Sequence, residues 1–365
     1  MNTRHSGWHP PHCPNPNCKH HNTSDDSWRF KRKGFYTRRI SPRRIQRFTC
    51  LHCGRNFSTQ TFSTTYWQKL PHLDAEIFMM TVGCMANRQI ARALRVSPST
   101  IDRHITRLGR HCLLYHARMV ENVPASGTVA VDGFETFELS QYYPFHHNVA
   151  VEIDSGFFLF HTDSPLRRKG RMTAYQKKRR RELEALHGRP DPQAVRKGMA
   201  ELLRFVTRDK ERMTVRSDEH RSYPPAMKGL KCRIHHEVTS SRDHRDKRNP
   251  LWEVNLLDLM IRHGTAAHKR ETIAWSKRRQ GSAERLAIFQ VWRNAIKRRW
   301  ENGAAMSSAM VKGVTRRLLN VRDVLAGRLF RTRVELPEVW RRYYDRAVET
   351  VGLGMNRRHE LTYAY

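Results

Sequence analysis

Residues 127–137 read Gly-Thr-Val-Ala-Val-Asp-Gly-Phe-Glu-Thr-Phe, and the expected fold is built outward from this stretch. It follows a Pro-Ala-Ser break, runs from Val129 to Val131 without alternation, and places Asp132 where the apolar run ends. An apolar run of this kind is typical of a central strand that is covered on both faces. A carboxylate at the end of such a strand is costly to bury unless it is hydrogen-bonded or holds a cation.

A second short strand ends in the same way. Residues 213–220 read Met-Thr-Val-Arg-Ser-Asp-Glu-His, with Asp218 at the end of the strand. Two strands that deliver carboxylates to one edge of a sheet would form a site for a divalent metal ion. The alternative is that Asp132 and Asp218 are ordinary turn residues, since Asp-Gly is a common turn signal.

The composition of the chain points to a polyanionic partner. Its 365 residues suffice for two or three domains, and they carry 68 Lys and Arg against 34 Asp and Glu, a formal charge of +34. A positive field of this size repels itself unless it meets nucleic acid. Because no segment approaches membrane-spanning length and no apolar signal segment begins the chain, we expect a cytoplasmic, nucleoid-associated protein without a membrane partner.

The N-terminal segment contains two close cysteine pairs, which are Cys13 with Cys18 and Cys50 with Cys53. Paired cysteines at such spacing predict a structural Zn²⁺ site formed by four thiolates. Residues 28–36 and 45–49 have the pattern of strands, so residues 1–62 are expected to form a zinc ribbon. Several histidines lie close enough in sequence to replace a thiolate: His12, His20, His21 and His52.

Residues 72–115 have the pattern of a helix-turn-helix domain. Asn87 is a plausible cap for a helix at 88–94, and Ser99 for a helix that ends at residue 108. The apolar side chains of that last helix repeat on one face, which leaves three polar ones pointing outward to a major groove: Arg103, His104 and Arg107. The alternative is a plain helical hairpin with a solvated outer face. Residues 113–126 are expected to form a linker.

The pattern from residue 126 to residue 300 predicts a larger domain. Three consecutive strands are expected between about 128 and 162, then the strand that ends in Asp218, and a fifth strand at 231–238. A basic helical insertion is expected at about 165–212, where a charged run would contact phosphates or be merely solvated: Lys177, Lys178 and Arg179. Residues 301–365 read as a helical C-terminal extension that packs on the body or contacts DNA.

Residues 252–263 read as a helix that supplies a third acid. Asp258 and Arg262 lie on one face of this helix, so Asp258 would complete a carboxylate cluster and Arg262 would lie near the substrate phosphates. Two other acids are alternatives for this role. They are Glu271 and Glu284, and a first-turn position in the expected long helix 282–300 already explains Glu284 through the helix dipole.

The order of these segments resembles that of the DDE transposases of bacterial insertion sequences, over nearly the whole chain. The order is a zinc ribbon, a helix-turn-helix, three strands, a strand ending in Asp, a fifth strand and an acid-bearing helix. The motifs that carry the resemblance are residues 131–133, Ser217-Asp218 with Tyr223 downstream, and residues 255–262. The resemblance implies a multi-domain α/β chain with an RNase H-like mixed-sheet catalytic domain.

The resemblance also implies which residues are catalytic. Asp132 and Asp218 match the first two acids, and Asp258 follows Asp218 by a few tens of residues, as the third acid of the family does. The family usually has Glu at that position, so Glu271 remains an alternative. Residues 270–277 are similar to a stretch that follows the catalytic helix in zinc-ribbon transposases, which implies a positioning or DNA-contacting role for Arg270.

The activity implied is DNA cleavage followed by strand transfer. Three carboxylates can hold two Mg²⁺ or Mn²⁺ ions roughly 3.5–4 Å apart. The zinc ribbon and helix-turn-helix would select the terminal inverted repeats, the basic helices would capture the target duplex, and pairing of two ends implies a homo-oligomer. The alternatives are a non-catalytic zinc-ribbon and helix-turn-helix DNA-binding regulator and an RNase H-like nuclease without strand transfer.

Overall fold

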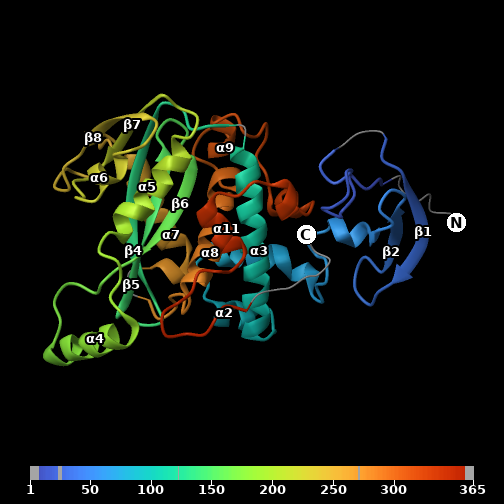
Figure 1. Cartoon of the computed structure of the whole chain (residues 1–365), viewed down its shortest axis with the longest axis horizontal. Coiled ribbons are helices and arrows are strands. Elements are labelled where there is room, and N and C mark those ends of the chain that lie inside the picture. Colours follow the sequence, from blue (N-terminus) through green and yellow to red (C-terminus); the bar gives the residue numbers. More distant parts are fainter. Residues whose placement is uncertain (1–7, 24–26, 122, 270–271, 358–365) are drawn as a thin grey trace.

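The protein consists of a small N-terminal unit and a larger body, which the polypeptide joins twice (Figure 1). The structure is a computed structural model of the whole chain, and it describes residues 8–23, 27–121, 123–269 and 272–357. Each part has its own sheet, one of three strands and one of five. Among the helices of these described ranges, none combines the length and the apolar character needed to cross a membrane.

The N-terminal unit is an antiparallel three-stranded sheet. Its strands are β1 (Phe30–Thr37), β2 (Arg44–Cys50) and β3 (Asn56–Ser58), in the order β1-β2-β3. The first two strands confirm the sequence prediction, whereas β3 was not predicted because three residues carry too little periodicity. The core is a set of aromatic rings packed around the cysteines, and Phe330 from the far end of the chain completes it.

Short 3₁₀ turns, η1 (Thr59–Phe62) and η2 (Pro71–Leu73), lead into three helices. The helices are α1 (Asp74–Val82), α2 (Asn87–Ala93) and α3 (Pro98–Val120).

Two details of these helices differ from the prediction. Ser97, not Ser99, caps α3, because the Ser97 side chain accepts a hydrogen bond from the Thr100 amide. Ala86 holds the cap position of α2, so Asn87 lies inside the helix. The linker expected at 113–126 is wrong, since buried residues continue the apolar face of α3 as far as Val120.

The five predicted strands of the body are all present and form one mixed sheet (Figure 1). They are β4 (Thr128–Glu138), β5 (Tyr143–Glu152), β6 (Phe158–Pro165), β7 (Arg212–Ser217) and β8 (Arg233–Val238). The strand order is β6-β5-β4-β7-β8. The first three strands pair antiparallel, while β4, β7 and β8 pair parallel.

Helices cover both faces of this sheet. Adjacent residues of β5 point to opposite faces: Asn148 lies against Gly198 of α5 (Ala194–Val206), and His147 lies against Ser282 of α8 (Arg279–Val291). Helix α7 (Trp252–Gly264) packs on β4 and β5 on the α8 side. A π-helical turn, Trp292–Ile296, ends the α8 segment, so the predicted helix to residue 300 is shorter than expected.

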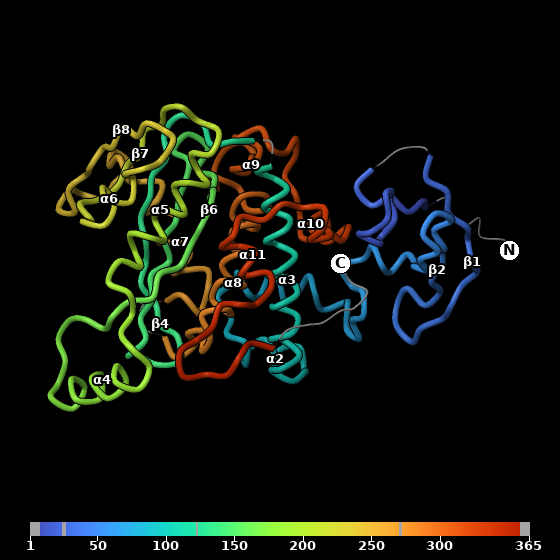
Figure 2. The backbone as a smooth tube through the Cα atoms, in the orientation of Figure 1, coloured from blue at the N-terminus to red at the C-terminus, as the bar shows by residue number. Residues whose placement is uncertain are grey.

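The basic insertion expected at 165–212 contains two helices that lie in different environments. Helix α4 (Ala174–His187) has no buried residue and stands away from the body (Figure 2). Helix α5, by contrast, buries Met199, Leu202 and Leu203 against the sheet. The predicted basic insertion therefore describes α4, whereas α5 belongs to the hydrophobic core.

The remaining short elements follow the sheet and α8. They are α6 (Tyr223–Met227), η3 (Ala266–His268), α9 (Ser308–Val311), α10 (Val321–Leu325), η5 (Arg331–Arg333) and α11 (Glu338–Tyr344). In the last of these helices, α11, the Trp340 side chain is fully buried. Its ring stacks on Phe160 with 4.7 Å between the ring centroids, and its indole N–H donates a hydrogen bond to the His161 carbonyl oxygen at 3.0 Å.

One hydrophobic core runs through the helices of residues 73–120, the sheet and the C-terminal extension. The boundaries expected at 115–126 and at 301 therefore separate segments of sequence and not separate cores.

Helix α3 crosses α8 at Gly109, where only a glycine fits. A Cβ atom at this position would lie 2.7 Å from the Glu284 carbonyl oxygen and 2.8 Å from its Cα atom. Backbone atoms cannot yield as a flexible side chain would.

We predict that Gly109→Ala lowers the free energy of unfolding by about 1–3 kcal/mol, although alanine is by itself the better helix former by about 1 kcal/mol. Chemical denaturation measures the change. Gly327→Ala is the matched control, because no atom lies within 4 Å of a Cβ added there. A stabilised Gly109→Ala variant would contradict the tight crossing.

Candidate functional site

Four cysteines come together at one end of the N-terminal sheet. The ligand atoms of Cys13, Cys18, Cys50 and Cys53 all lie within 4.8 Å of one another, and the Sγ atoms of Cys13 and Cys53 are 3.6 Å apart. This spacing suits a tetrahedral Zn²⁺ ion with bonds of about 2.3 Å to sulfur.

Hydrogen bonds around the cluster favour the thiolate form of Cys50. Burial raises the pKa of Cys50, but hydrogen bonds from the Trp28 indole and from the amides of Cys53 and His52 outweigh it and bring the pKa down to about 7. A thiolate is the form that binds metal.

Two of the neighbouring histidines, His12 and His21, lie within hydrogen-bonding distance of other oxygen atoms. The imidazole Nδ1 atoms of His12 and His21 both lie within hydrogen-bonding distance of the Cys13 carbonyl oxygen, and Nε2 of His21 is 2.7 Å from the Thr332 hydroxyl. Among the described residues, the group that could hold a metal contains the four cysteines and no histidine.

The second candidate centre begins with the parallel pairing of β4 and β7. Thr128 pairs with Thr214, and the register continues to Ala130 and Arg216. When this register is continued by two residues, Asp132 in the middle of β4 comes level with Asp218, which directly follows β7. The two predicted acids therefore lie where the pairing of β4 with β7 ends, although β4 itself continues to Glu138.

Helix α7 carries Asp258, and the negative charges of all three predicted acids act on Tyr223. The Tyr223 side chain is fully buried. Burial raises the pKa of its phenol, and the negative charges of Asp132, Asp218 and Asp258 raise it further. One phenol is thus within electrostatic range of all three predicted carboxylates.

The carboxylates are not packed as closely as the thiolates. Across the part of the chain that the structure describes, the cysteine cluster is the one group of three or more potential ligands within 4.8 Å of one another. At least one pair among the three carboxylates is therefore further apart.

Asp132 is a half-buried acid whose pKa is raised. Burial raises its pKa to about 6, the charge of Asp218 adds to the rise, and the Gly133 amide together with Arg245 and Arg262 opposes it. The Gly133 amide donates to Oδ1 of Asp132 at 2.7 Å. A bound divalent ion would favour the ionised form of such an acid.

The surroundings of the acids explain two features of the sequence. A Cβ atom on Gly133 would lie 1.6 Å from Nε2 of His146, so the glycine after Asp132 makes room for an imidazole. On the other strand, the His220 amide donates to Oδ1 of Asp218 at 3.0 Å and orients that carboxylate. His146 and Arg245 were not predicted as site residues, because neither belongs to a local motif.

Arg262, which was predicted to lie near the substrate phosphates, lies beside Phe134. Its guanidinium carbon is 5.4 Å from the centroid of the Phe134 ring, and its charge acts on the pKa of Asp132. The arginine is therefore next to the carboxylates.

The alternative third acids have different outcomes. Glu284 is buried at the α3–α8 crossing, where it accepts hydrogen bonds from Thr106 and Gln280 and forms an ion pair of 2.9 Å with Arg346. These contacts explain its burial without any metal. Glu271 and the predicted DNA contact Arg270 lie outside the described residues.

The predicted DNA contacts of α3 need correction. Arg103 is exposed, as expected. His104 is buried, and its Nδ1 atom lies 2.6 Å from the Asp74 carboxylate. Arg107 points inward and donates to the Thr64 and Tyr66 carbonyl oxygens. The prediction of an outward orientation is wrong for the last two because α1 and the segment before it cover that face.

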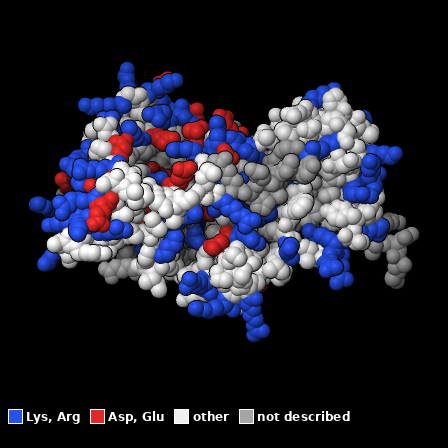
Figure 3. All heavy atoms as spheres, turned by 60° about the horizontal axis from the view of Figure 1, so that its bottom comes forward, with Lys and Arg blue, Asp and Glu red and all other residues white. Residues whose placement is uncertain are grey.

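Basic side chains remain exposed elsewhere. Lys177, Lys178 and Arg179 lie on the exposed helix α4, where Arg179 pairs with Glu182 at 2.9 Å. Residues 27–73 contain no Asp or Glu, although Lys and Arg occur throughout them. On the face shown in Figure 3, acidic side chains gather on the body and basic ones cover both parts.

We predict that the cysteine cluster holds one Zn²⁺ ion per chain and that Cys50→Ser releases it. Loss of the ion should unfold the N-terminal sheet, since the binding free energy of structural zinc is about 10–16 kcal/mol in small domains. Metal analysis of purified protein measures the stoichiometry. Cys84→Ser is the control, because Cys84 lies outside the cluster; equal zinc in both variants would refute the assignment.

We predict that Asp132→Asn stabilises the protein when divalent ions are absent. Because the folded-state pKa is about 6 against an ordinary value of 3.8, the ionised carboxylate costs folding free energy that grows as pH rises from about 4 to 6. The variant should therefore match wild type at pH 4 and exceed its stability at pH 7.5 by up to about 3 kcal/mol. Adding Mg²⁺ should stabilise wild type and leave the variant unchanged.

Thermal unfolding at both pH values, with and without Mg²⁺, tests this prediction. Asp154→Asn is the control, since Asp154 is an exposed acid in the turn between β5 and β6. An equal gain from Mg²⁺ in wild type and Asp132→Asn would exclude Asp132 as a ligand.

Comparison with known proteins adds only distant structural similarity. No protein-family model matches the chain, and no curated protein does. Among solved structures, the chain is similar to a chain of the cryo-EM structure of the simian T-cell lymphotropic virus intasome in complex with PP2A regulatory subunit B56 gamma. The identity is 13%, the match covers 52% of this chain and 55% of that chain, and the TM-score is 0.23. A similarity this low carries no argument about function.

Proposed function

We propose that the protein is a DDE-type transposase that cuts DNA at the ends of an insertion sequence and joins those ends to a target. The observation that supports the proposal is that the charges of Asp132, Asp218 and Asp258 all act on the buried Tyr223 phenol in a strongly basic chain. A protein that only binds DNA has no need of three half-buried acids whose charges act on one buried phenol. The order of three strands, an Asp strand, a fifth strand and an acid-bearing helix also agrees with the RNase H-like domain that the resemblance implies.

The proposed roles follow from the positions of the residues. Asp132, Asp218 and Asp258 would hold two Mg²⁺ or Mn²⁺ ions, which when bound activate the attacking hydroxyl and stabilise the leaving oxygen. Carboxylate oxygens are the ligands that these ions prefer, whereas the thiolates suit zinc. Arg245 and Arg262 would neutralise the scissile phosphate beside the acids.

The DNA-binding elements would position the substrate. Strand β1 is exposed along most of its length and carries Lys31, Arg32 and Lys33, so we assign the zinc ribbon of residues 1–62 to duplex binding. Arg103 on α3 and the basic residues of α4 would contact further phosphates. Residues 72–115 would act as the helix-turn-helix, residues 126–300 as the catalytic domain, and residues 301–365 as the extension that holds them together.

The assembly would be a homo-oligomer that pairs two terminal inverted repeats, acting in the cytoplasm at the nucleoid. Pairing of two ends requires at least two copies of the DNA-binding elements, which is why a single chain would not suffice.

The test is Mg²⁺-dependent cleavage and joining of a duplex that carries the terminal repeat of the element encoding this chain. Asp132→Asn and Asp218→Asn should abolish both reactions and retain DNA binding, and Asp154→Asn should retain all activities. Between Asp258→Asn and Glu271→Gln, the inactive variant identifies the third ligand.

Other outcomes would change the assignment. Cleavage without joining would indicate an RNase H-like nuclease. Binding without either reaction, in a protein with its zinc in place, would favour a DNA-binding regulator.

A further inference from the structure

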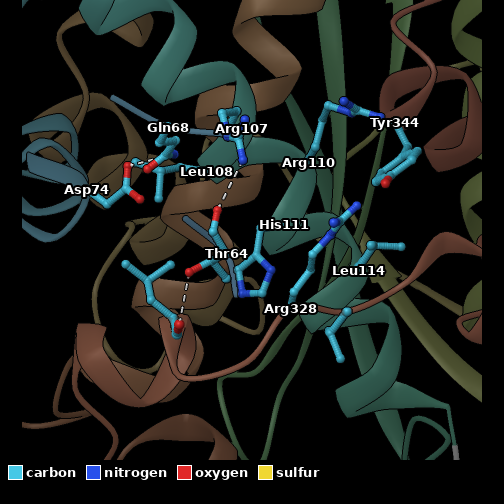
Figure 4. Close-up of a pocket in the computed structure, with 12 residues that line it drawn as sticks. Thr64, Gln68, Asp74, Arg107, Leu108, Arg110, His111, Leu114, Arg328 and Tyr344 are labelled. Carbon is cyan, nitrogen blue, oxygen red and sulfur yellow. Dashed lines mark hydrogen bonds between the residues drawn. The ribbon is translucent and has the colours of Figure 1, made fainter. Parts of the chain in front are cut away.

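A pocket lies where the segment between the ribbon and α1 crosses α3 and meets the returning C-terminal segment (Figure 4). Side chains from all three segments line it, among them Thr64, Arg107, Arg110, Arg328 and Tyr344. Its volume is about 80 Å³, which is room for several water-sized groups. The pocket is separate from the carboxylate centre, and neither centre shares a lining residue with the other.

Arg107 and Arg110 both line the pocket. Among the described residues, no acid forms an ion pair with either guanidinium group. Arg107 donates to the carbonyl oxygens of Thr64 and Tyr66, which are neutral acceptors. The guanidinium carbon of Arg110 lies 4.2 Å from the centroid of the Tyr344 ring, and its buried Nε atom has no hydrogen-bond partner among the described residues. Neither arrangement neutralises a positive charge.

Arg328 adds a third guanidinium from the opposite wall (Figure 4). One of its nitrogens donates to the Thr61 carbonyl oxygen at 3.2 Å, and its guanidinium carbon lies 5.3 Å from the centroid of the Tyr66 ring. Its own amide donates to the Phe62 carbonyl oxygen at 2.9 Å, so the same residue ties the C-terminal segment to the end of the ribbon.

Asp74, the acid that lines the pocket, already forms hydrogen bonds with two other side chains. Oδ1 of Asp74 lies 2.6 Å from the His104 imidazole and accepts from the Gln68 amide at 3.2 Å. Burial lowers the pKa of Arg107, and Arg110 lowers it further while Asp74 opposes the change. The lowered pKa means that the positive charge of Arg107 is held at a cost in free energy, which an anion in the pocket would reduce.

We propose that this pocket binds a phosphate group. Guanidinium groups recognise phosphate through several charge-assisted hydrogen bonds, and a tetrahedral anion offers acceptors to donors on different walls. Because the walls belong to the ribbon segment, α3 and the C-terminal segment, a bound phosphate would fix the ribbon relative to the body. The phosphate is either free in solution or part of a DNA backbone, and the site itself does not rest on the proposed function.

Inorganic phosphate tests the site directly. Phosphate is titrated against full-length, zinc-loaded protein at constant ionic strength, with chloride as the balancing anion, and binding is followed by calorimetry. We expect wild type to bind one phosphate, Arg110→Gln to bind it at least tenfold more weakly, and Arg118→Gln to bind it like wild type. Arg118 lies on the same helix and is exposed outside the pocket. No binding to wild type, or equal binding by all three proteins, would overturn the proposal.

A measurement on wild type alone tests the same site even if the Arg110→Gln variant does not fold. Hydrogen exchange with and without phosphate should show slower exchange of amides in residues 60–66 and 325–330, which line or adjoin the pocket. Unchanged exchange in both segments under saturating phosphate would also overturn the proposal.

The source of the phosphate is identified by the salt dependence of DNA affinity. If a backbone phosphate occupies the pocket, Arg110→Gln should reduce the slope of log Kd against log salt by about one, whereas Arg118→Gln should not. An unchanged slope together with lost binding of inorganic phosphate would assign the pocket to a free anion. Loss of DNA cleavage through failure of the carboxylate centre would affect neither result, so the two proposals fail independently.

Discussion

The parallel pairing of β4 with β7 is the constraint on which the candidate site depends. The pairing buries Val129 and Val215 in the centre of the sheet and, through its register, sets Asp132 level with Asp218. A shift of one residue would turn every side chain of a strand to the opposite face. The apolar run that stabilises the sheet therefore also determines where Asp132 lies, and burial there, with a smaller effect of Asp218, raises the pKa of Asp132.

A second structural feature is that one core holds helices α1, α2 and α3 against the sheet. Helix α3 crosses α8 at Gly109, α11 buries Trp340 against β6, and Phe330 enters the aromatic core of the ribbon. The C-terminal extension thus connects all the preceding parts. A substrate bound to the ribbon would be held at a defined position relative to the carboxylates.

The sequence was most informative where local pattern and burial agree. Apolar runs predicted all five strands of the body, and the cysteine pairs predicted a cluster that the structure brings together. Asp132, Asp218 and Asp258 were chosen from strand ends and one helix face, and all three lie within electrostatic range of Tyr223. In these cases short-range sequence determines long-range position, because the strand register and helix period are fixed.

Prediction failed where a second partner covered a face that looked solvated. His104 and Arg107 have the spacing of an exposed helix face, but Asp74 and the carbonyl oxygens of residues 64 and 66 meet them. Such contacts join residues about 30 to 40 positions apart, and no local pattern encodes them. The predicted basic insertion likewise did not separate the exposed helix α4 from helix α5, which is buried against the sheet.

The central claim is that the three carboxylates form a two-ion site, and the most direct test is to locate the ions. Crystals grown with zinc bound and soaked in Mn²⁺ would distinguish the two metals by anomalous scattering at their absorption edges. The account predicts zinc within the four cysteines and two manganese peaks between Asp132, Asp218 and Asp258. Ordered acids with no manganese between them, at a concentration that supports DNA cleavage, would contradict it.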